Sequence, residues 1–211
     1  MTALRTSLMA AVFALATAIT TQAHADLIIT ANGTVEPGSD PTNTSTSFSG
    51  SVGGFNINVV TASGINAFGG NGKVLDVGSL NISTLGTGSL TLVVTETNLS
   101  GNVPTQFNVL FDAFNQVNVN VTRSLFLDTT NSGAETTQLA TTSSPGASVV
   151  TSSPQGLTGL YSLTEEIDLT ATGPGALLSA DDSVTVPEPI SLVLLGSGLL
   201  GVGLIRRRKQ A

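Results

Sequence analysis

The 211-residue chain contains no cysteine and no tryptophan, and it has one histidine and seven basic side chains. Without cysteine there is no disulfide bond, no thiol nucleophile and no thiolate metal site. The one histidine, His24, lies in an N-terminal segment that is predicted below to be removed. Its loss excludes a serine–histidine–aspartate triad and a histidine-bound zinc or copper from the mature chain.

Basic charge is scarcest between residues 26 and 186. This stretch of 161 residues contains 13 acidic side chains and two basic ones, Lys73 and Arg123, for a net charge of −11. Such a chain is repelled by nucleic acid and by anionic membrane surfaces, so nucleic-acid binding is excluded. Its length is sufficient for one domain with a core of its own.

Good helix formers are also few in this stretch, which is rich in Thr, Ser, Asn, Gly and Val. Val117, Val119 and Val121 alternate with polar residues, which predicts a strand with one buried face. Phe107 to Ala113 alternate in the same way, and Leu110 and Phe114 indicate a strand covered on both sides. The pattern therefore predicts an all-β fold.

Further strands are predicted at Leu27–Ala31, Phe55–Thr61, Leu80–Ser83, Leu90–Thr95, Leu125–Asp128, Ala147–Thr151, Tyr161–Thr170 and Val184–Val186. Turns are predicted at Gly69–Gly72 and at Asn131–Gly133, because both are rich in residues that tolerate positive φ. The stretches Glu36–Ser51 and Thr136–Pro154 are expected to be long loops or loosely held strands. Short strands separated by frequent turns predict an antiparallel β-sandwich, jelly-roll-like in type.

The acidic side chains are the remaining candidates for chemistry. A glycosidase needs two carboxyl groups facing each other across the sugar bond. Glu165-Glu166 and Asp181-Asp182 are neighbours in sequence, so on a strand the members of each pair point to opposite faces. Only a pair from different strands is left open, and an enzyme is not expected.

Calcium is a second use for such acids, because it takes six to eight hard oxygen ligands. Glu166 and Asp168 are expected on one face of a strand, and Asp181 and Asp182 in a loop near the end of the body. No EF-hand-type loop is present, and solvated acids that keep the protein soluble are the alternative. No cofactor is expected, with calcium kept as an open possibility. Tyr161, the only tyrosine, is expected at the edge of the core rather than as a sugar-binding platform.

The two ends of the chain have the composition of export signals. Arg5 precedes an apolar segment, Leu8 to Ile19, and Ala23-His24-Ala25 has the small-residue pattern of a signal-peptide cleavage site. At the other end, 16 uncharged residues run from Ile190 to Ile205. As a helix they would extend about 24 Å, which is short for a bilayer core of roughly 30 Å.

The apolar run is bounded on both sides. Pro187, Glu188 and Pro189 precede it, and Arg206, Arg207, Arg208 and Lys209 follow it. The prolines favour a stiff, extended approach, and the cations favour a cytoplasmic end. An ordinary single-span anchor is one interpretation, and the small residues Ser197 and Gly201 allow a helix dimer.

This arrangement of proline-flanked glutamate, Leu/Gly-rich helix and terminal arginines resembles the PEP-CTERM sorting signal of Gram-negative bacteria. The resemblance implies that an exosortase-type membrane enzyme recognises Pro187, Glu188 and Pro189, removes the helix and passes the protein towards the cell surface. It covers only about 25 residues and implies, more loosely, a β-sandwich body of unassigned function.

The expected organisation is a signal peptide with an N-terminal helix at residues 1–25, with Ala23 and Ala25 as its cleavage-site residues and cleavage after Ala25, and a β-sandwich body at residues 26–186. A sorting signal with a transmembrane helix is expected at residues 187–211, with Arg206 to Lys209 as the stop. The expected partners are the secretion machinery, the exosortase-type enzyme, transiently the inner membrane, and exopolysaccharide. The expected function is that of a non-enzymatic surface or extracellular-matrix protein associated with biofilm; the alternative is a module that binds calcium or polysaccharide.

Overall fold

The structure, a computed structural model, describes residues 26–37, 45–64, 73–100, 107–143, 148–152 and 159–185. For strand residues 58–64, 73, 100 and 148–152 it describes the backbone alone. The strands are β1 (Asp26–Ala31), β2 (Thr34–Val35), β3 (Ser45–Val52), β4 (Phe55–Gly64), β5 (Lys73–Thr84), β6 (Gly88–Ser100), β7 (Phe107–Val117), β8 (Val119–Asp128), β9 (Thr137–Ser143), β10 (Ser148–Ser152), β11 (Leu160–Ala171) and β12 (Ala176–Thr185).

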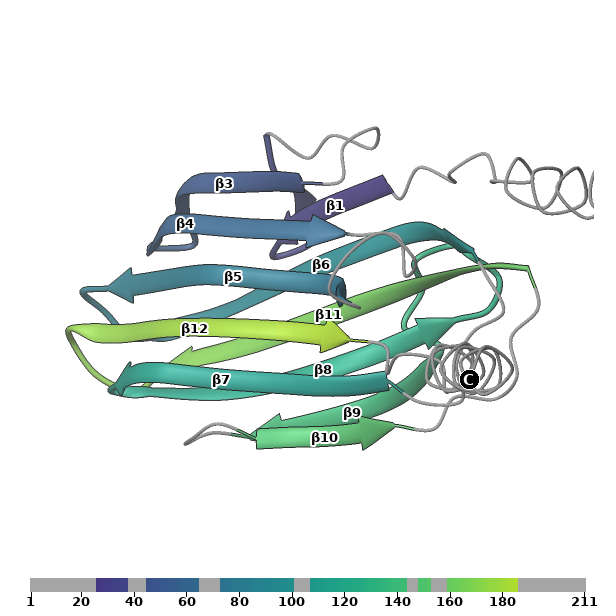
Figure 1. Ribbon diagram of the computed structural model, residues 1–211. Coiled ribbons are helices and arrows are strands. Elements are labelled where there is room, and N and C mark those ends of the chain that lie inside the picture. Colours follow the sequence, from purple (N-terminus) through teal and green to yellow (C-terminus); the bar gives the residue numbers. More distant parts are fainter. Residues whose placement is uncertain are drawn as a thin grey trace, which may run out of the picture.

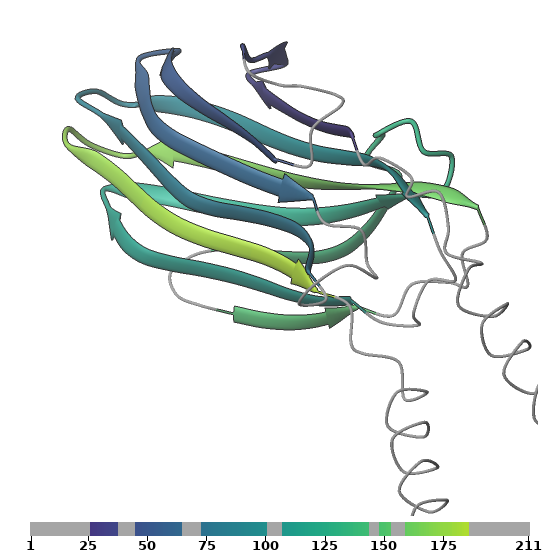
Figure 2. The ribbon, with the colours of Figure 1, turned by 45° about the horizontal axis from the view of Figure 1, so that its top comes forward.

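These strands form two antiparallel sheets that face each other as the layers of a sandwich (Figure 1). Sheet A has the order β2-β1-β6-β11-β8-β9, and sheet B has the order β10-β7-β12-β5-β4-β3. Within the described residues, three connections carry the chain from one sheet to the other: between β5 and β6, between β7 and β8, and between β11 and β12. Figure 2 shows these connections at one end of the molecule. The predicted all-β, jelly-roll-like sandwich is therefore confirmed.

The core lies between the sheets and follows from strict alternation of side chains. On β6, Leu90, Leu92 and Val94 are buried, whereas Thr91 and Val93 between them are only partly buried. A shift of one residue in any strand would turn its apolar side chains to the solvent, so this pattern fixes the register. The inward-facing aromatic side chains with the largest volume are Phe55, Phe107, Phe111 and Tyr161.

A sharp corner at Asn118 joins β7 in sheet B to β8 in sheet A. Asn118 has a φ of 50°, a left-handed conformation that asparagine tolerates better than most residues. Its side-chain Nδ2 donates a hydrogen bond to the Pro174 carbonyl (3.0 Å), and its own carbonyl accepts one from the Thr172 amide (2.8 Å). The β7–β8 corner is thereby tied to the neighbouring β11–β12 corner.

Most predicted strands and one predicted turn are found. The segments Leu27–Ala31, Phe55–Thr61, Leu80–Ser83, Leu90–Thr95, Leu125–Asp128 and Tyr161–Thr170 all lie within strands. Asn131 and Gly133 adopt positive φ (60° and 77°) in the connection between β8 and β9. The Gly69–Gly72 turn and Val186 lie outside the described residues.

Three expectations need correction. Val117 does not share a strand with Val119, because the chain turns at Asn118, and Val117 is 43% exposed. The strand β7 is not covered on both sides, since Phe114 is 69% exposed. Asp181 and Asp182 lie in the middle of β12 rather than in a loop. For the two stretches expected to be loops or loosely held strands, the structure has the second form, with β3, β9 and β10 in them.

Candidate functional site

Four charged side chains lie inside the sandwich and form what we call the core charge cluster: Glu96, Arg123, Glu165 and Asp182. Glu96, Glu165 and Asp182 are 0% exposed and Arg123 is 1% exposed. Arg123, Glu165 and Asp182 each lie between buried apolar residues two positions away on the same face of their strand, and Glu96 follows Leu92 and Val94 on the inward positions of β6. These side chains are therefore buried because the strand register places them on the inner face, and not because of their own conformation.

The cluster links the two sheets through one ion pair. Arg123 Nε on β8 of sheet A lies 3.2 Å from Asp182 Oδ2 on β12 of sheet B. The other carboxylate oxygen of Asp182 accepts a hydrogen bond from the Asp112 amide (2.9 Å). In the part of the chain that the structure describes, neither carboxyl oxygen of Glu96 has a hydrogen-bond partner, whereas the carboxyl group of Glu165 interacts with that of Asp182.

The buried carboxyl groups hold protons more tightly than usual. Burial raises the pKa of Glu96 from 4.5 to about 8. Burial, and then the negative charge of Asp182, raise the pKa of Glu165 well above its ordinary value, against the opposing effect of Arg123. Burial also raises the pKa of Asp182 to about 6, although Arg123 acts in the opposite direction. At neutral pH Asp182 is therefore the ionised partner of Arg123.

The burial of these residues was not predicted from the sequence, because a charged residue usually lies at the surface. The sequence did contain a signal for burial, namely a charged residue at an inward position of an alternating apolar pattern. Arg123 falls between Val121 and Leu125 on the inward positions of β8, and Asp182 falls between Ala180 and Val184 on β12.

A further buried acid, Asp128, organises the connection from β8 to β9. Its Oδ1 accepts hydrogen bonds from the Thr130 amide (2.8 Å) and hydroxyl (2.7 Å), and its Oδ2 from the Ser132 amide (2.7 Å) and hydroxyl (2.6 Å). Burial alone would raise the pKa of Asp128, but these four hydrogen bonds outweigh it and hold the pKa well below its usual range. Asp128 therefore has a structural role.

On the outer face of sheet A, Glu166 and Asp168 share one face of β11, as predicted. Asp168 accepts a hydrogen bond from the Thr91 hydroxyl (2.6 Å). Burial, and then the charge of Glu135, raise the pKa of Glu166 to about 7. These carboxylates repel one another, which is the usual condition for attracting a cation.

On the outer face of sheet B, Asp112 of β7 lies directly opposite Asp181 of β12. This is a cross-strand acid pair of the kind that the sequence left open. Among residues 26–37, 45–64, 73–100, 107–143, 148–152 and 159–185, however, no group of three or more His, Cys, Asp or Glu residues is arranged to hold a metal ion.

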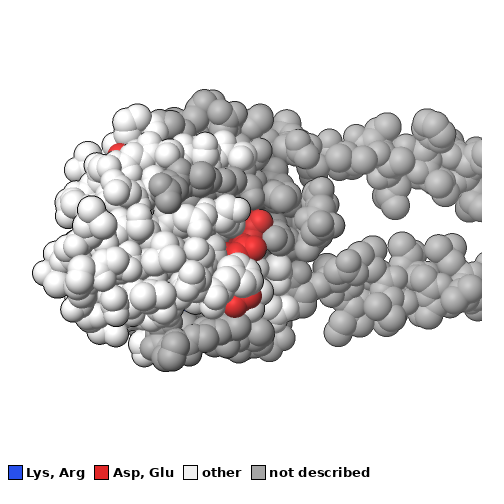
Figure 3. All heavy atoms as spheres, turned by 90° about the vertical axis from the view of Figure 1, so that its left-hand side faces the viewer, with Lys and Arg blue, Asp and Glu red and all other residues white. Residues whose placement is uncertain are grey.

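The described surface carries acidic groups without basic ones. Arg123 is the only basic residue whose side chain is described, and it is buried; the side chain of Lys73 lies outside the described set. On the face in Figure 3 acidic atoms are visible and no basic atoms are visible. Among the described side chains, no cation at the surface is therefore available to bind an anionic ligand.

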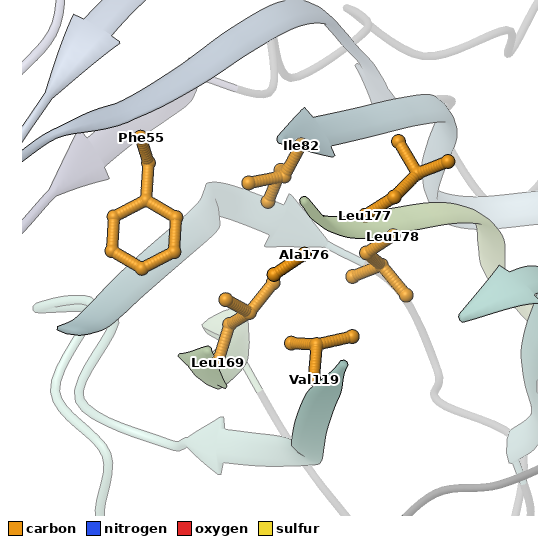
Figure 4. Close-up of a pocket in the computed structure, with 7 residues that line it drawn as sticks. All are labelled: Phe55, Ile82, Val119, Leu169, Ala176, Leu177 and Leu178. Atoms are coloured by element: carbon orange, nitrogen blue, oxygen red, sulfur yellow. The ribbon is translucent and has the colours of Figure 1, made fainter. Parts of the chain in front are cut away.

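A narrow pocket lies at the end of the sandwich near the β11–β12 corner (Figure 4). Its lining is entirely apolar: Phe55, Ile82, Val119, Leu169, Ala176, Leu177 and Leu178. Sugar and cofactor sites need a few convergent polar groups to orient the ligand. This pocket offers none and is better explained as a packing defect.

Tyr161 lies deeper than expected. It is 2% exposed, and its ring centroid is 6.5 Å from that of Phe107 at an interplanar angle of 51°. Burial, and then the charge of Glu96, raise the pKa of Tyr161. The residue is part of the core and does not offer a sugar-binding surface.

The residues predicted to direct export lie outside the described part of the chain: Ala23, Ala25, Pro187, Glu188, Pro189, Arg206, Arg207, Arg208 and Lys209. Their individual roles remain predictions. Within the described ranges, no helix has both the length and the apolar character needed to cross a membrane.

Comparison with solved structures finds weak likenesses to carbohydrate-active proteins. The Bacillus subtilis glycoside hydrolase family 43 arabinoxylan arabinofuranohydrolase in complex with cellotetraose has a TM-score of 0.30 and 13% identity, over 63% of this chain and 25% of that one. A carbohydrate-binding module of the β-sandwich superfamily has a TM-score of 0.36 and 15% identity, over 66% and 59%. The C-terminal family 22 module of a Clostridium thermocellum protein has a TM-score of 0.30 and 14% identity, over 69% and 92%.

The first two of these matches span less than two thirds of the known protein. At such low scores the likenesses carry no functional argument. No curated protein matches the chain.

The C-terminal segment gives a definite match. The family model of the PEP-CTERM protein-sorting motif matches residues 185–209, which include the predicted recognition residues, the apolar run and the four terminal cations. The match begins at Thr185, the last residue of β12. The chain therefore carries a PEP-CTERM sorting motif at its C-terminal end, and this motif indicates an exported protein that is sorted by an exosortase-type system and has a C-terminal membrane-anchoring region.

Proposed function

We propose that residues 26–186 form a non-enzymatic surface or extracellular-matrix protein, and that both ends of the chain serve only its delivery. In this proposal residues 1–25 direct entry into the secretion machinery and are cleaved after Ala25. The exosortase-type enzyme then recognises Pro187, Glu188 and Pro189 while Arg206 to Lys209 hold the far end in the cytoplasm.

The observation that supports this division best is the place of the sorting motif relative to the core. The motif is matched from Thr185 onward, and all residues of the described hydrophobic core lie between Leu27 and Val184. In this proposal, removal of the tail leaves the described packing of the body intact, as a delivery signal requires.

Two features of the body favour a role without catalysis. The carboxyl groups with the most strongly raised pKa values, Glu96 and Glu165, are fully buried and cannot touch a substrate. The pocket at the end of the sandwich has no polar lining. Association with exopolysaccharide and biofilm is the finer part of the proposal, and it rests on the sorting route rather than on a site in the sandwich.

The test is mass spectrometry of the protein recovered outside the host cell. The expected product begins at Asp26 and lacks Arg206 to Ala211. Replacing Pro187, Glu188 and Pro189 together by alanine should leave the protein with the membrane, whereas Pro154→Ala, a matched proline replacement in the body, should be released normally. Released protein that still carries Arg206 to Ala211 would refute the proposal.

The second candidate is a calcium-binding or polysaccharide-binding module delivered by the same route. The opposed pair Asp112 and Asp181 favours it, because two carboxylates on neighbouring strands can share one divalent cation. Calorimetric titration with calcium and with the host polysaccharide separates the candidates. Binding heat that Asp181→Asn abolishes and Asp168→Asn preserves would support the module; absence of heat would favour the first proposal.

A further inference from the structure

The core charge cluster contains more acids than one cation can balance. Three carboxyl groups, from Glu96, Glu165 and Asp182, are fully buried, and Arg123 is the only described basic side chain among them. A buried carboxylate without a countercharge is so costly that the group takes up a proton instead. One guanidinium can therefore keep one of the three ionised.

Contacts decide which carboxyl group is ionised. Asp182 has Arg123 at 3.2 Å and the Asp112 amide at 2.9 Å, and both stabilise a negative charge. The carboxyl oxygens of Glu96 have no hydrogen-bond partner in the described part of the chain. The carboxyl group of Glu165 interacts with that of Asp182, and this contact favours a protonated Glu165 beside an ionised Asp182. The two glutamates are therefore the groups that carry protons.

We propose that the core is a proton-dependent latch: Glu96 and Glu165 hold two protons in the folded body at neutral pH that the unfolded chain releases, so the sandwich loosens as the pH rises. This property belongs to the body itself and is independent of sorting.

The groups around Glu165 favour its neutral form. Asp182 on β12 and Asp76 on β5 disfavour a second negative charge, while Arg123 on β8 acts in the opposite direction. Its partner in the ladder on β6 is Val94, which offers no charge. The acids outnumber the single cation, and burial adds to their effect.

The surroundings of Glu96 are simpler. Its ladder partners are Leu163 on β11 and Leu27 on β1, both apolar and fully buried. Tyr161 on β11 is close enough for the charge of Glu96 to raise the pKa of the tyrosine hydroxyl. Ionisation of either group would therefore oppose that of the other, and both stay neutral in the folded core.

The direction of the pH dependence follows from these protons. Both glutamates have raised pKa values in the folded state, to about 8 for Glu96 from an ordinary 4.5. Their contribution to stability is complete below pH 4.5 and is lost as the pH rises towards the folded-state pKa. Each retained proton makes the unfolding equilibrium constant rise about tenfold per pH unit, so the pair gives about hundredfold.

Urea unfolding of the full-length chain in detergent, between pH 6 and 7, tests the latch. Fluorescence of Tyr161 is a convenient signal, because it is the only tyrosine and the chain has no tryptophan. Because the raised pKa of Glu166, about 7, would add to the slope, all proteins in this test carry Glu166→Gln. In this background the protein should show a rise of about hundredfold per pH unit in the unfolding constant. Glu96→Gln and Glu165→Gln should each reduce it to about tenfold, and the two together should remove it. Asp168→Asn, on the outer face of the same strand as Glu165, should leave it unchanged.

Infrared spectroscopy counts the protons without unfolding the protein. At pH 7 the folded chain should show the carbonyl band of protonated carboxyl groups, at about half intensity in Glu96→Gln. The readout remains informative if Glu165→Gln does not fold. An absent band at pH 7, an unfolding constant that does not change with pH, or a full slope in both single variants would overturn the proposal.

Discussion

The residue with the largest predicted effect is Arg123, because it alone compensates a carboxylate inside the described core. Replacing it with methionine keeps the side-chain length but leaves Asp182 without its countercharge. We expect Arg123→Met to lower the free energy of unfolding by about 3–5 kcal/mol. Urea denaturation at pH 7 would measure this loss.

The control for this prediction removes both charges. In Arg123→Met combined with Asp182→Asn, the asparagine can still accept the hydrogen bond from the Asp112 amide, and no buried charge is left unpaired. Most of the lost stability should return in this double variant. If the double variant is no more stable than the single one, the ion pair is not the reason for the loss.

Asp128 is expected to govern stability in acid rather than in alkali. Its folded-state pKa is held below the ordinary value of 3.8, so its contribution is complete above pH 3.8 and is lost as the pH falls further. Asp128→Ala should cost on the order of 2–3 kcal/mol at neutral pH, since hydrogen bonds to a charged acceptor are lost. Hydrogen exchange of the Thr130 and Ser132 amides should then become faster.

Glu135 provides the control for the Asp128 prediction. Glu135→Gln, in the same connection as Asp128 but exposed, should leave the exchange of the Thr130 and Ser132 amides almost unchanged. Unaltered exchange in Asp128→Ala would show that the loop is held by other contacts.

At the scale of the elements, the corner at Asn118 sets where the chain leaves sheet B for sheet A. Asn118→Ala removes the hydrogen bond to the Pro174 carbonyl and places an ordinary L-residue at positive φ. Together these changes should cost about 1–3 kcal/mol. Asn118→Gly keeps the backbone freedom and should cost less. A thermal midpoint lowered equally by both variants would contradict the importance of the φ angle.

The strands were predictable from sequence where alternation is local and uninterrupted, as in Leu90 to Thr95. The corner was not, because Val117 and Val119 keep the same spacing through it, and period-2 alternation does not reveal a change of sheet. The buried acids were missed for a different reason. The positions of Glu165 and Asp182 depend on the pairing of distant strands, and residue type alone favours the surface.

At the scale of the whole molecule, the tail should contribute nothing to the stability of the sandwich. Deletion of residues 186–211 removes no member of the described core, so we expect the free energy of unfolding to change by less than about 0.5 kcal/mol. Deletion from Ala176 onward also removes β12 and should abolish folding. Circular dichroism during thermal unfolding in the same detergent would compare the variants. A large loss on removing residues 186–211 alone would mean that the body extends into the tail.

The sorting tail follows β12, which is a central strand of sheet B and not an edge strand. Thr185 pairs with Asn108 on one side and Lys73 on the other, and β12 is bonded to both β7 and β5 along its length. A force applied through the tether is thus shared by two rows of backbone hydrogen bonds, which must shear together before the strand can slip. A strand at the edge of the sheet would be held by only one such row. While the protein is attached to the membrane, its own attachment point is mechanically among the least fragile parts of the domain.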